Sequence, residues 1–387
     1  MIIEPKVRGF ICTTAHPDGC MENVKKQIEY TKNKGKKDGS KKVLIIGSST
    51  GYGLAARIAV TYGEGASTLG VMFEKEATER KTASAGWYNT VAFEEFARKD
   101  GYYAKSINGD AFSKEVKDKV IKTIKEDLGK VDMVIYSLAA PKRKTEDGTI
   151  YNSTLKTTEE VFTNKSLDLR NNTVVEATIP MANEKEIEDT IKVMGGEDWK
   201  QWIESLVEAD VIERDAITIA YSYIGPELTY PVYYNGTIGR AKKDLYNTSL
   251  DITREFKDRG IKAYISVNKA IVTQASSAIP IVPLYMSILY KVMKEKNIHE
   301  GAIEQMNRLF RKKLSNDVIV VDKKNRIRLD DYEMREDVQE QVMEYWNKIN
   351  SQNINDFADV DGYWNDFYNM FGFKFDNVDY TKDIKLV

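Results

Sequence analysis

The sequence contains few of the residues from which many kinds of site are built. Among 387 residues there are only two cysteines, Cys12 and Cys20, and two histidines, His16 and His299. These are too few for a disulfide framework, and Cys12, His16 and Cys20 lack the fourth ligand and the spacing of a common zinc site. A Ser-His-Asp hydrolase is also disfavoured, because neither histidine has suitable partners nearby in the sequence. Because so few cysteine and histidine ligands are present, we also expect no metal site.

The sequence also lacks an excess of one charge and a long apolar run. Lysine and arginine (57) nearly balance aspartate and glutamate (59), so the net charge of -2 gives no general attraction to nucleic acid or to a membrane. The most apolar run, residues 279–293, contains two prolines and is too short to span a bilayer, so we expect a buried helix there. The first ten residues lack the apolar core of a signal peptide, which favours a cytoplasmic protein.

What the sequence does contain is a regular alternation of strand-like and helix-like segments. In the segment 113–129, for example, apolar residues recur at every fourth position, as in an amphipathic helix. Such alternation predicts an α/β fold, a Rossmann-type doubly wound parallel sheet with helices on both faces. The expected strands are residues 41–47, 66–74, 102–108, 131–139, 216–222 and 262–268.

Three segments are larger than such a sheet requires. Residues 1–40 form an N-terminal extension that ends in a lysine-rich stretch, interpreted as a solvated helix end or, alternatively, as a patch that attracts phosphate. Residues 41–387 are expected to form a single domain. Within it, residues 141–215 are a long insertion after the fourth strand that we expect to cover a substrate. Residues 295–387 are mostly helical, with a strand-like run at 316–322.

A glycine-rich turn follows the first expected strand. Gly47, Gly51 and Gly53 have the spacing G-x3-G-x-G and precede a helical pattern, so the backbone can approach a pyrophosphate at the helix N-terminus. Glu74 ends the second strand 21 residues after Gly53, close to the offset at which an acidic side chain binds the adenosine ribose. Because a carboxylate repels a 2′-phosphate, NADH is favoured over NADPH, although Lys75 could weaken that preference.

Two further loops fall at the carboxyl ends of strands, where open α/β sheets bind ligands. Residues 108–112 follow the third strand and offer an aspartate for the adenine. Residues 137–141 follow the fourth strand, and their small side chains allow the backbone to pass beneath the ribose. In this order, and together with the glycine turn, the two loops predict a dinucleotide site.

The fifth expected strand leads into a segment rich in tyrosine. Tyr223 ends the strand, Tyr233 follows ten residues later, and Lys242 lies on the next helix. On one continuous helix, the nine-residue step from Tyr233 to Lys242 would place the two side chains on opposite sides. However, the Asn-Gly pair that ends at Gly236 predicts a turn, with Thr237 as the N-cap. Tyr233 would then lie on a loop, with Lys242 about one turn inside the helix.

Other tyrosines compete for this role. Tyr234 adjoins Tyr233 and differs from it only in register. Tyr290 and Lys294 have the shorter Tyr-x3-Lys spacing that many nicotinamide-dependent reductases use. This pair follows the sixth strand instead of the fifth, so we interpret it as incidental.

On these motifs the sequence resembles the trans-2-enoyl-CoA reductases and the FabV-type enoyl-acyl-carrier-protein reductases, enlarged relatives of the short-chain dehydrogenases. The resemblance covers essentially the whole chain. It implies a monomer that uses NADH to reduce the carbon-carbon double bond of a trans-2-enoyl-CoA thioester. No flavin-specific motif appears in the sequence, so we expect no flavin. A carrier-protein thioester of fatty acid biosynthesis is the alternative substrate, and a non-catalytic NAD(H) sensor is a further alternative. The motifs that carry the resemblance are AHPDGC, GSSTGYGLA, GWYN, YSLAAP, VMGGEDW, AYSYIGPE, SVNKAIVTQASSAIP, VMKEKNIHE and Tyr-x8-Lys.

The resemblance also implies roles for individual residues. Tyr233 would donate the proton and Tyr223 would contact the substrate. Lys242 and the Ile271–Thr273 loop, which we call the nicotinamide loop, would contact the nicotinamide half of NADH. The residue types alone leave open which tyrosine stabilises the enolate and which supplies the proton. The implied cofactor-binding residues are Gly47, Ser48, Ser49, Thr50, Gly51, Tyr52, Gly53, Phe73, Glu74, Asp110, Ala111, Leu138, Ala139, Lys242, Ile271, Val272 and Thr273.

Overall fold

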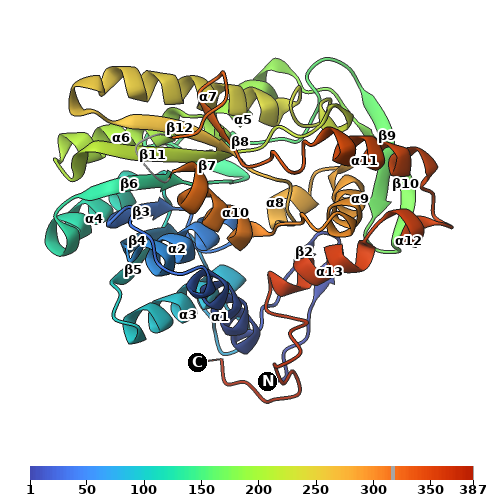
Figure 1. Cartoon of the computed structure of the whole chain (residues 1–387), viewed down its shortest axis with the longest axis horizontal. Coiled ribbons are helices and arrows are strands. Elements are labelled where there is room, and N and C mark those ends of the chain that lie inside the picture. Colours follow the sequence, from blue (N-terminus) through green and yellow to red (C-terminus); the bar gives the residue numbers. More distant parts are fainter. Residues whose placement is uncertain (315–318, 387) are drawn as a thin grey trace.

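A parallel sheet of seven strands forms the centre of the computed structural model, which describes residues 1–314 and 319–386 (Figure 1). In chain order the strands are β3 (Lys42–Ile46), β4 (Ser67–Met72), β5 (Ala104–Asn108), β6 (Val131–Tyr136), β11 (Ile212–Ser222), β12 (Lys262–Val267) and β13 (Arg326–Arg328). Their order across the sheet is β13-β12-β11-β6-β3-β4-β5. The chain thus starts in the middle, builds one half of the sheet and returns to build the other, as in a doubly wound fold.

The sequence of strand β3 shows why helices cover both faces of the sheet. Side chains alternate along a strand, so Val43 and Ile45 point to one face while Leu44 and Ile46 point to the other, and all four are fully buried. The predicted α/β class with helices on both faces is therefore confirmed. One face carries α1 (Pro17–Asn33), α2 (Gly51–Glu64), α3 (Ala85–Lys99) and α10 (Ala302–Arg308), and the other carries α4 (Lys114–Thr123), α6 (Glu197–Glu208) and α7 (Thr237–Glu255).

The insertion after β6 contributes to two different layers. Helix α6 is the crossover helix between β6 and β11, and its Trp199 and Trp202 are fully buried beneath it. The residues before α6 form the hairpin of β7 (Lys142–Lys144) and β8 (Ile150–Asn152), the ribbon of β9 (Phe162–Asp168) and β10 (Thr173–Ile179), and helix α5 (Glu184–Met194). Only this first part of the insertion stands clear of the central sheet.

A third layer packs the β9–β10 ribbon with segments from both ends of the sequence into one apolar cluster, although the two termini themselves lie away from the ribbon (Figure 1). Its centre is helix α9 (Val282–Glu295), whose side chains are mostly buried, so the buried helix expected within residues 279–293 is confirmed. Its other elements are β1 (Val7–Arg8), β2 (Ile11–Cys12), α8 (Gln274–Ser277), α11 (Glu336–Lys348), α12 (Ile354–Phe357) and α13 (Val360–Asn369). Within the described residues, no helix is long and apolar enough to cross a membrane.

The C-terminal region differs from the expectation in one respect. Of the strand-like run at 316–322, residues 316–318 lie outside the described residues, and residues 319–322 form no strand. The strand that this region contributes is β13, which pairs with β12 at the edge of the sheet. Three residues carry too little of an alternating pattern to be recognised as a strand in the sequence.

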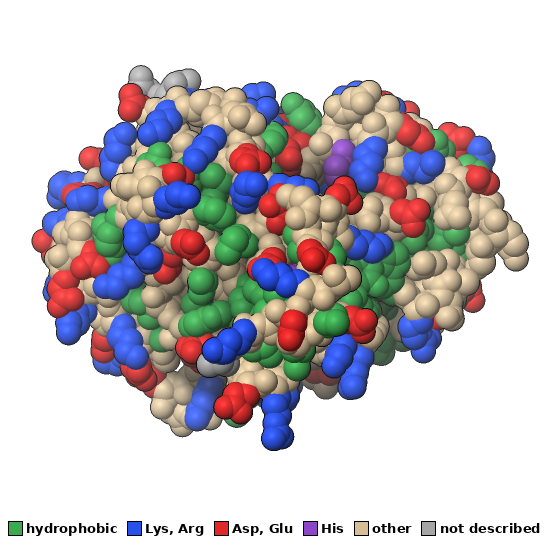
Figure 2. Space-filling model, turned by 90° about the horizontal axis from the view of Figure 1, so that it is seen from below, with side chains coloured by type: hydrophobic (Ala, Val, Ile, Leu, Met, Phe, Trp, Pro, Cys, Tyr) green, Lys and Arg blue, Asp and Glu red, His purple; other side chains and the backbone are tan. Residues whose placement is uncertain are grey.

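The lysine-rich end of the N-terminal extension lies at the amino ends of the strands, far from the edge where ligands are expected. Lys42 begins β3, and the backbone N–H of Lys37 donates to the carbonyl of Gly63 near the end of α2. Lys32 and Lys41 are paired with acidic side chains. Figure 2 shows the same intermixing of basic and acidic side chains over one face of the molecule. This placement favours a solvated helix end over a phosphate-binding patch.

A buried ion pair joins α6 to α4. Lys117 Nζ lies 2.7 Å from Asp198 Oδ1, and the hydroxyl of Tyr136 in β6 donates to Asp198 Oδ2 at 3.0 Å. Lys117 also donates to the carbonyls of Ala111 and Phe112, in the loop after β5. Burial raises the pKa of Asp198, and the ammonium of Lys117 opposes that rise. The pair therefore fixes α6 and the loop after β5 at one point.

We expect Asp198→Ala to lower the free energy of unfolding by about 3–5 kcal/mol, because it leaves the Lys117 ammonium buried without a countercharge. Urea unfolding and the thermal midpoint measure this change. Asp118→Ala is the matched control. Asp118 forms an exposed ion pair of 3.1 Å with Lys114, and both lie on α4, the helix that carries Lys117. It should cost less than about 1 kcal/mol. Equal losses in the two variants would contradict a special role for the buried pair.

Candidate active site

The glycine turn between β3 and α2 has the geometry of an anion site. Gly47 and Gly51 have φ angles of +84° and +52°, which favour glycine. A Cβ at Gly53 would lie 1.8 Å from the carbonyl oxygen of Gly47, so a larger residue would displace the turn. Thr50, the N-cap of α2, makes no side-chain capping hydrogen bond, which leaves the first N–H groups of the helix available. The turn therefore fits the pyrophosphate of a dinucleotide.

Glu74 is held beside this turn. Ser49 Oγ donates to Glu74 Oε1 at 2.6 Å, and the side chain of Asn108 binds both the N–H and the C=O of Glu74, at 2.8 and 2.9 Å. The preceding residue, Phe73, is 76% exposed at the same edge. A fixed carboxylate next to an open aromatic ring suits the hydroxyls of a ribose and the face of an adenine.

The GWYN motif (residues 86–89) supports the glycine turn, a role that the sequence analysis missed. Asn89 is buried, and its Nδ2 donates to the carbonyl of Ser49 at 3.2 Å. A Cβ at Gly86 would lie 2.0 Å from Glu74 Oε1, so glycine makes room for the carboxylate. In the sequence, the motif could be singled out only because it is one of those that carry the family resemblance. Its chemistry becomes visible once helix α3 is placed against the turn.

The other expected loops lie at the same edge of the sheet. Asp110 Oδ1 accepts the N–H of Phe112 at 3.0 Å, which forms a compact turn after β5. Leu138, in the loop after β6, packs against the position of Gly47, and Thr273, in the loop after β12, packs against Gly51. The structure thus brings together the loops that were singled out separately in the sequence.

Tyr233 lies in a turn that precedes helix α7, as expected. The N-cap is Gly236 and the predicted cap Thr237 is wrong by one residue, because Thr237 already belongs to the helix and its hydroxyl donates to the carbonyl of Thr154. A Cβ at Gly239 would lie 1.8 Å from the carbonyl oxygen of Tyr234, so glycine lets the turn fold back onto the helix. The break between Tyr233 and α7 explains the nine-residue step to the lysine.

Tyr233 and Tyr223 form an edge-to-face pair. Their ring centroids lie 4.9 Å apart with an interplanar angle of 80°, and burial raises the pKa of both phenols. Tyr233 is 9% exposed, and its hydroxyl makes no hydrogen bond to any residue that the structure describes. Tyr234 is instead 43% exposed and packs against Tyr230. Of the two adjacent tyrosines, Tyr233 is therefore the one that enters the buried cluster.

Lys242 places a cation at the carboxyl end of β11. Its Nζ donates to the carbonyl oxygen of Tyr221 at 3.1 Å, two residues before Tyr223. Burial lowers the pKa of Lys242 to about 8. A positive charge at this point favours the anionic form of a neighbouring phenol.

The loop of Ile271, Val272 and Thr273 is anchored from behind. The N–H of Val272 donates to the hydroxyl of Tyr290 at 3.2 Å, and Thr273 caps helix α8 through a hydrogen bond from the N–H of Ser276 at 3.0 Å. Tyr290 supports this loop, whereas Lys294 pairs with Asp359 elsewhere. Tyr290 and Lys294 thus have separate partners, in keeping with the interpretation of their spacing as incidental.

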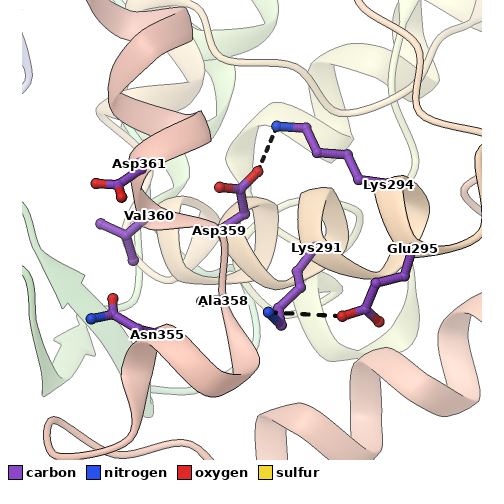
Figure 3. Close-up of a pocket in the computed structure, with 8 residues that line it drawn as sticks. All are labelled: Lys291, Lys294, Glu295, Asn355, Ala358, Asp359, Val360 and Asp361. Carbon is purple, nitrogen blue, oxygen red and sulfur yellow. Dashed lines mark hydrogen bonds and ion pairs between the residues drawn. The ribbon is translucent and has the colours of Figure 1, made fainter.

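A separate hollow of about 320 Å³ lies between α9 and α13 (Figure 3). Lys294 and Asp359 form an ion pair of 2.5 Å in its wall, and Lys291 and Glu295 form another of 3.8 Å. None of the expected site residues lines it. The hollow is therefore distinct from the edge where the loops converge.

Comparison with models of known families covers nearly the whole chain. Residues 81–315 match the trans-2-enoyl-CoA reductase catalytic region, and residues 2–79 match the NAD(P)H binding domain of trans-2-enoyl-CoA reductase. Residues 321–384 match a model described as the enoyl reductase FAD binding domain.

Individual relatives give the same result. The chain is 54% identical over 387 residues to the trans-2-enoyl-CoA reductase (NADH) of Ruminiclostridium cellulolyticum, covering 100% of this chain and 98% of the relative. It is 57% identical over 385 residues to the enoyl-acyl-carrier-protein reductase (NADH) of Flavobacterium johnsoniae, covering 99% and 97%. The crystal structure of Clostridium acetobutulicum trans-2-enoyl-CoA reductase in complex with NADH matches with a TM-score of 0.97 and 47% identity, covering 100% and 98%.

Residues 321–384 do not fit a flavin dinucleotide. Their two glycines are Gly362, which lies inside α13, and Gly372, whose Cβ would meet the backbone of His16 and Cys20. Neither forms a turn between a strand and a helix, where a pyrophosphate binds. The aromatic side chains of this segment are largely buried in the third layer. We assign no step to a flavin.

The motifs in the sequence had already indicated this family and its fold. The catalytic-region model alone matches more than half of the chain, and the solved relative has the same architecture over its whole length. The chain belongs to the trans-2-enoyl-CoA reductase family, and it is an oxidoreductase.

Proposed function

We propose that this chain, acting as a monomer in the cytoplasm, uses NADH to reduce the carbon-carbon double bond of trans-2-enoyl-CoA thioesters such as crotonyl-CoA. The observation that carries the proposal is the meeting of three features at one edge of the sheet. These are an open pyrophosphate turn, a fixed carboxylate beside it, and a buried pair of tyrosines at the end of β11, where Lys242 binds the carbonyl of Tyr221. Bound NADH supplies the hydride that adds to the β-carbon of the substrate.

The chain itself has to stabilise negative charge on the thioester oxygen and to supply a proton for the α-carbon. We assign proton donation to Tyr233, because its hydroxyl has no partner among the described residues and its raised pKa keeps the phenol protonated. Tyr223 already donates its proton to Glu333 Oε1 at 2.8 Å. The ammonium of Lys242 then favours the phenolate that Tyr233 leaves behind.

The insertion is proposed to cover the acyl chain through its β9–β10 ribbon. Leu167 and Ile179 of the ribbon belong to the same apolar cluster as Tyr233 and helix α9. The ribbon is tied to the segment before α9 by a hydrogen bond of 3.2 Å from the N–H of Ile281 to Ser166 Oγ. An acyl chain that extends from Tyr233 would therefore meet apolar walls.

The alternative substrate is an enoyl thioester of the acyl carrier protein. Trans-2-enoyl-CoA reductases and enoyl-acyl-carrier-protein reductases match this chain equally well, and the lysine-rich segment lies away from the site. Neither feature therefore distinguishes the CoA thioester from the carrier-protein thioester. Loss of NADH absorbance with crotonyl-CoA and with crotonyl-acyl-carrier protein separates the two. We expect the higher kcat/KM with crotonyl-CoA. Faster turnover of the carrier-protein thioester would make the chain a fatty-acid-synthesis reductase, and NADH binding without turnover of either would favour a sensor.

We expect Tyr233→Phe to lower kcat by at least about a hundredfold, the usual contribution of a positioned acid, while the Kd for NADH changes little. Stopped-flow turnover and NADH fluorescence titration measure the two quantities. Tyr234→Phe is the matched control, because this neighbouring tyrosine is exposed, and it should keep nearly full activity. Comparable losses in the two variants would remove Tyr233 from its proposed role.

We expect Glu74→Ala to raise the KM for NADH roughly tenfold, in line with the loss of a hydrogen bond to a charged group, and to improve the relative use of NADPH. Steady-state kinetics with each cofactor give the ratio. Glu76→Ala is the control, because Glu76 is exposed on the same loop two residues later. A cofactor ratio that stays constant in Glu74→Ala would show that Glu74 does not contact the ribose.

A further inference from the structure

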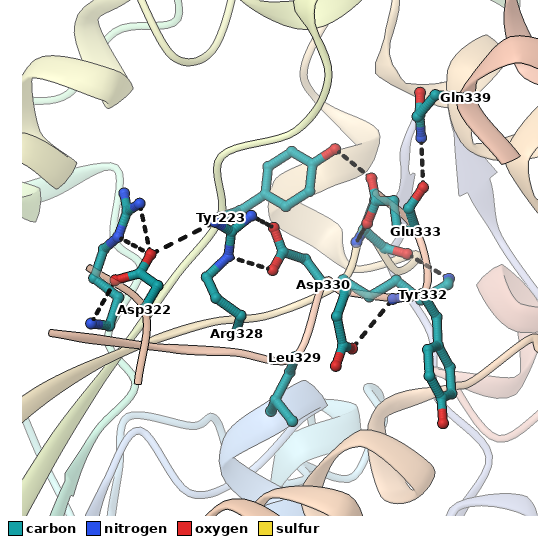
Figure 4. A network of polar contacts seen from close by, with 12 residues as sticks. Tyr223, Asp322, Arg328, Leu329, Asp330, Tyr332, Glu333 and Gln339 are labelled. Atoms are coloured by element: carbon teal, nitrogen blue, oxygen red, sulfur yellow. Dashed lines mark hydrogen bonds and ion pairs between the residues drawn. The ribbon is translucent and has the colours of Figure 1, made fainter. Parts of the chain in front are cut away.

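Glu333 is fully buried and lies in the segment that follows β13, within hydrogen-bonding distance of Tyr223 (Figure 4). Its Oε1 accepts hydrogen bonds from the hydroxyls of Tyr223 and Tyr285, at 2.8 and 2.7 Å. Its Oε2 accepts the N–H of Ala270 at 2.8 Å, immediately before the Ile271–Thr273 loop. One carboxylate therefore contacts the end of β11, helix α9 and the nicotinamide loop.

The surroundings of Glu333 differ from those of an ordinary buried acid. Asp330, three residues earlier, is equally buried, but it binds Arg328 through both oxygens, at 2.7 and 2.6 Å (Figure 4). Glu333 has no such arginine. Its carboxylate hydrogen bonds come from two phenols and a backbone N–H group, and the nearby ammonium of Lys269 is bound to the carbonyl of Ala270 at 2.8 Å. Because burying a carboxylate is costly, an arrangement built from site residues points to a role in the site.

A phenol carries a single proton. When Tyr223 donates that proton to Glu333, its oxygen can face the substrate only as an acceptor, and its ring is fixed edge-on to Tyr233. We propose that Glu333 is a positioning residue for the reduction: it holds the hydroxyl of Tyr223 away from the thioester oxygen, so that Tyr233 is the tyrosine that donates. This inference rests on the proposed function, which it deepens.

The same contacts show how the role can be isolated. In Glu333→Gln the amide oxygen can still accept the N–H of Ala270, so the nicotinamide loop keeps its anchor. The amide nitrogen would face Tyr223 and Tyr285 and would donate to their hydroxyls, which reverses the direction of those hydrogen bonds. Any change in kcat would then result from the altered hydrogen bonds of Tyr223 and Tyr285, while the Kd for NADH would stay the same.

The test is a double-mutant cycle of Glu333→Gln and Tyr223→Phe, with turnover of crotonyl-CoA as the readout. We expect Glu333→Gln alone to lower kcat about tenfold, as for one lost charge-assisted hydrogen bond, with less than about a twofold change in the Kd for NADH. In the Tyr223→Phe background the same substitution should change kcat less than about twofold, because the hydroxyl on which it acts is gone. Glu333→Asp keeps the charge but draws the carboxylate back from Tyr223, and it serves if the glutamine variant does not fold. Its kcat loss should likewise depend on the Tyr223 hydroxyl, whereas only the glutamine variant tests the unchanged Kd for NADH, because the shorter side chain also withdraws from the N–H of Ala270.

Asp330→Asn is the control for a merely structural effect. It removes a buried carboxylate from the same segment, so it should lower the thermal midpoint and have the same effect on kcat with and without the Tyr223 hydroxyl. Equal kcat losses from Glu333→Gln in both backgrounds, or no loss in the first, would overturn the role of Glu333 while wild-type turnover still supports the proposed reductase. If the wild type reduces no enoyl thioester, the proposed function itself fails and this inference fails with it.

Discussion

The parallel direction of the strands is the constraint on which the site depends. Because all seven strands run the same way, their carboxyl ends meet at one edge, and the loops after β3, β4, β5, β6, β11 and β12 meet there too. Residues as far apart as Gly51 and Thr273 become neighbours for this reason. Each loop supplies one part of the chemistry, and the sheet provides the alignment.

That constraint also explains how much of the site could be predicted from the sequence. The glycine turn, Glu74 and the pair of Tyr233 and Lys242 are local features, since each lies at the end of a recognisable strand or in a short segment with its own pattern. The order of the strands then places them at one edge. The fold class and the family could be predicted for the same reason, because strand and helix patterns repeat along most of the chain.

The features that could not be predicted depend on contacts between distant segments. Asn89 supports Ser49 across 40 positions of sequence, and Glu333 meets Tyr223 across 110. Neither residue has a local pattern that distinguishes it from an ordinary polar side chain. Strand β13 could not be predicted for a related reason: its three residues form a strand only because they pair with β12. Sequence pattern identifies elements and turns, whereas the supports behind a site become visible only in three dimensions.

The C-terminal part of the third layer supports the loops of the candidate site in this way. Loops at the carboxyl edge of a sheet have no further strand to hold them, so their backbone groups need partners from elsewhere. Tyr290 on α9 accepts the N–H of Val272, and Glu333 accepts that of Ala270, so two buried acceptors hold the loop after β12. The segment matched by the flavin-binding model therefore contacts the candidate site through Glu333. The same layer buries Tyr233, which lies on the turn before α7 and belongs to the apolar cluster of α9, so this tyrosine is held in place without being part of the helix that carries Lys242.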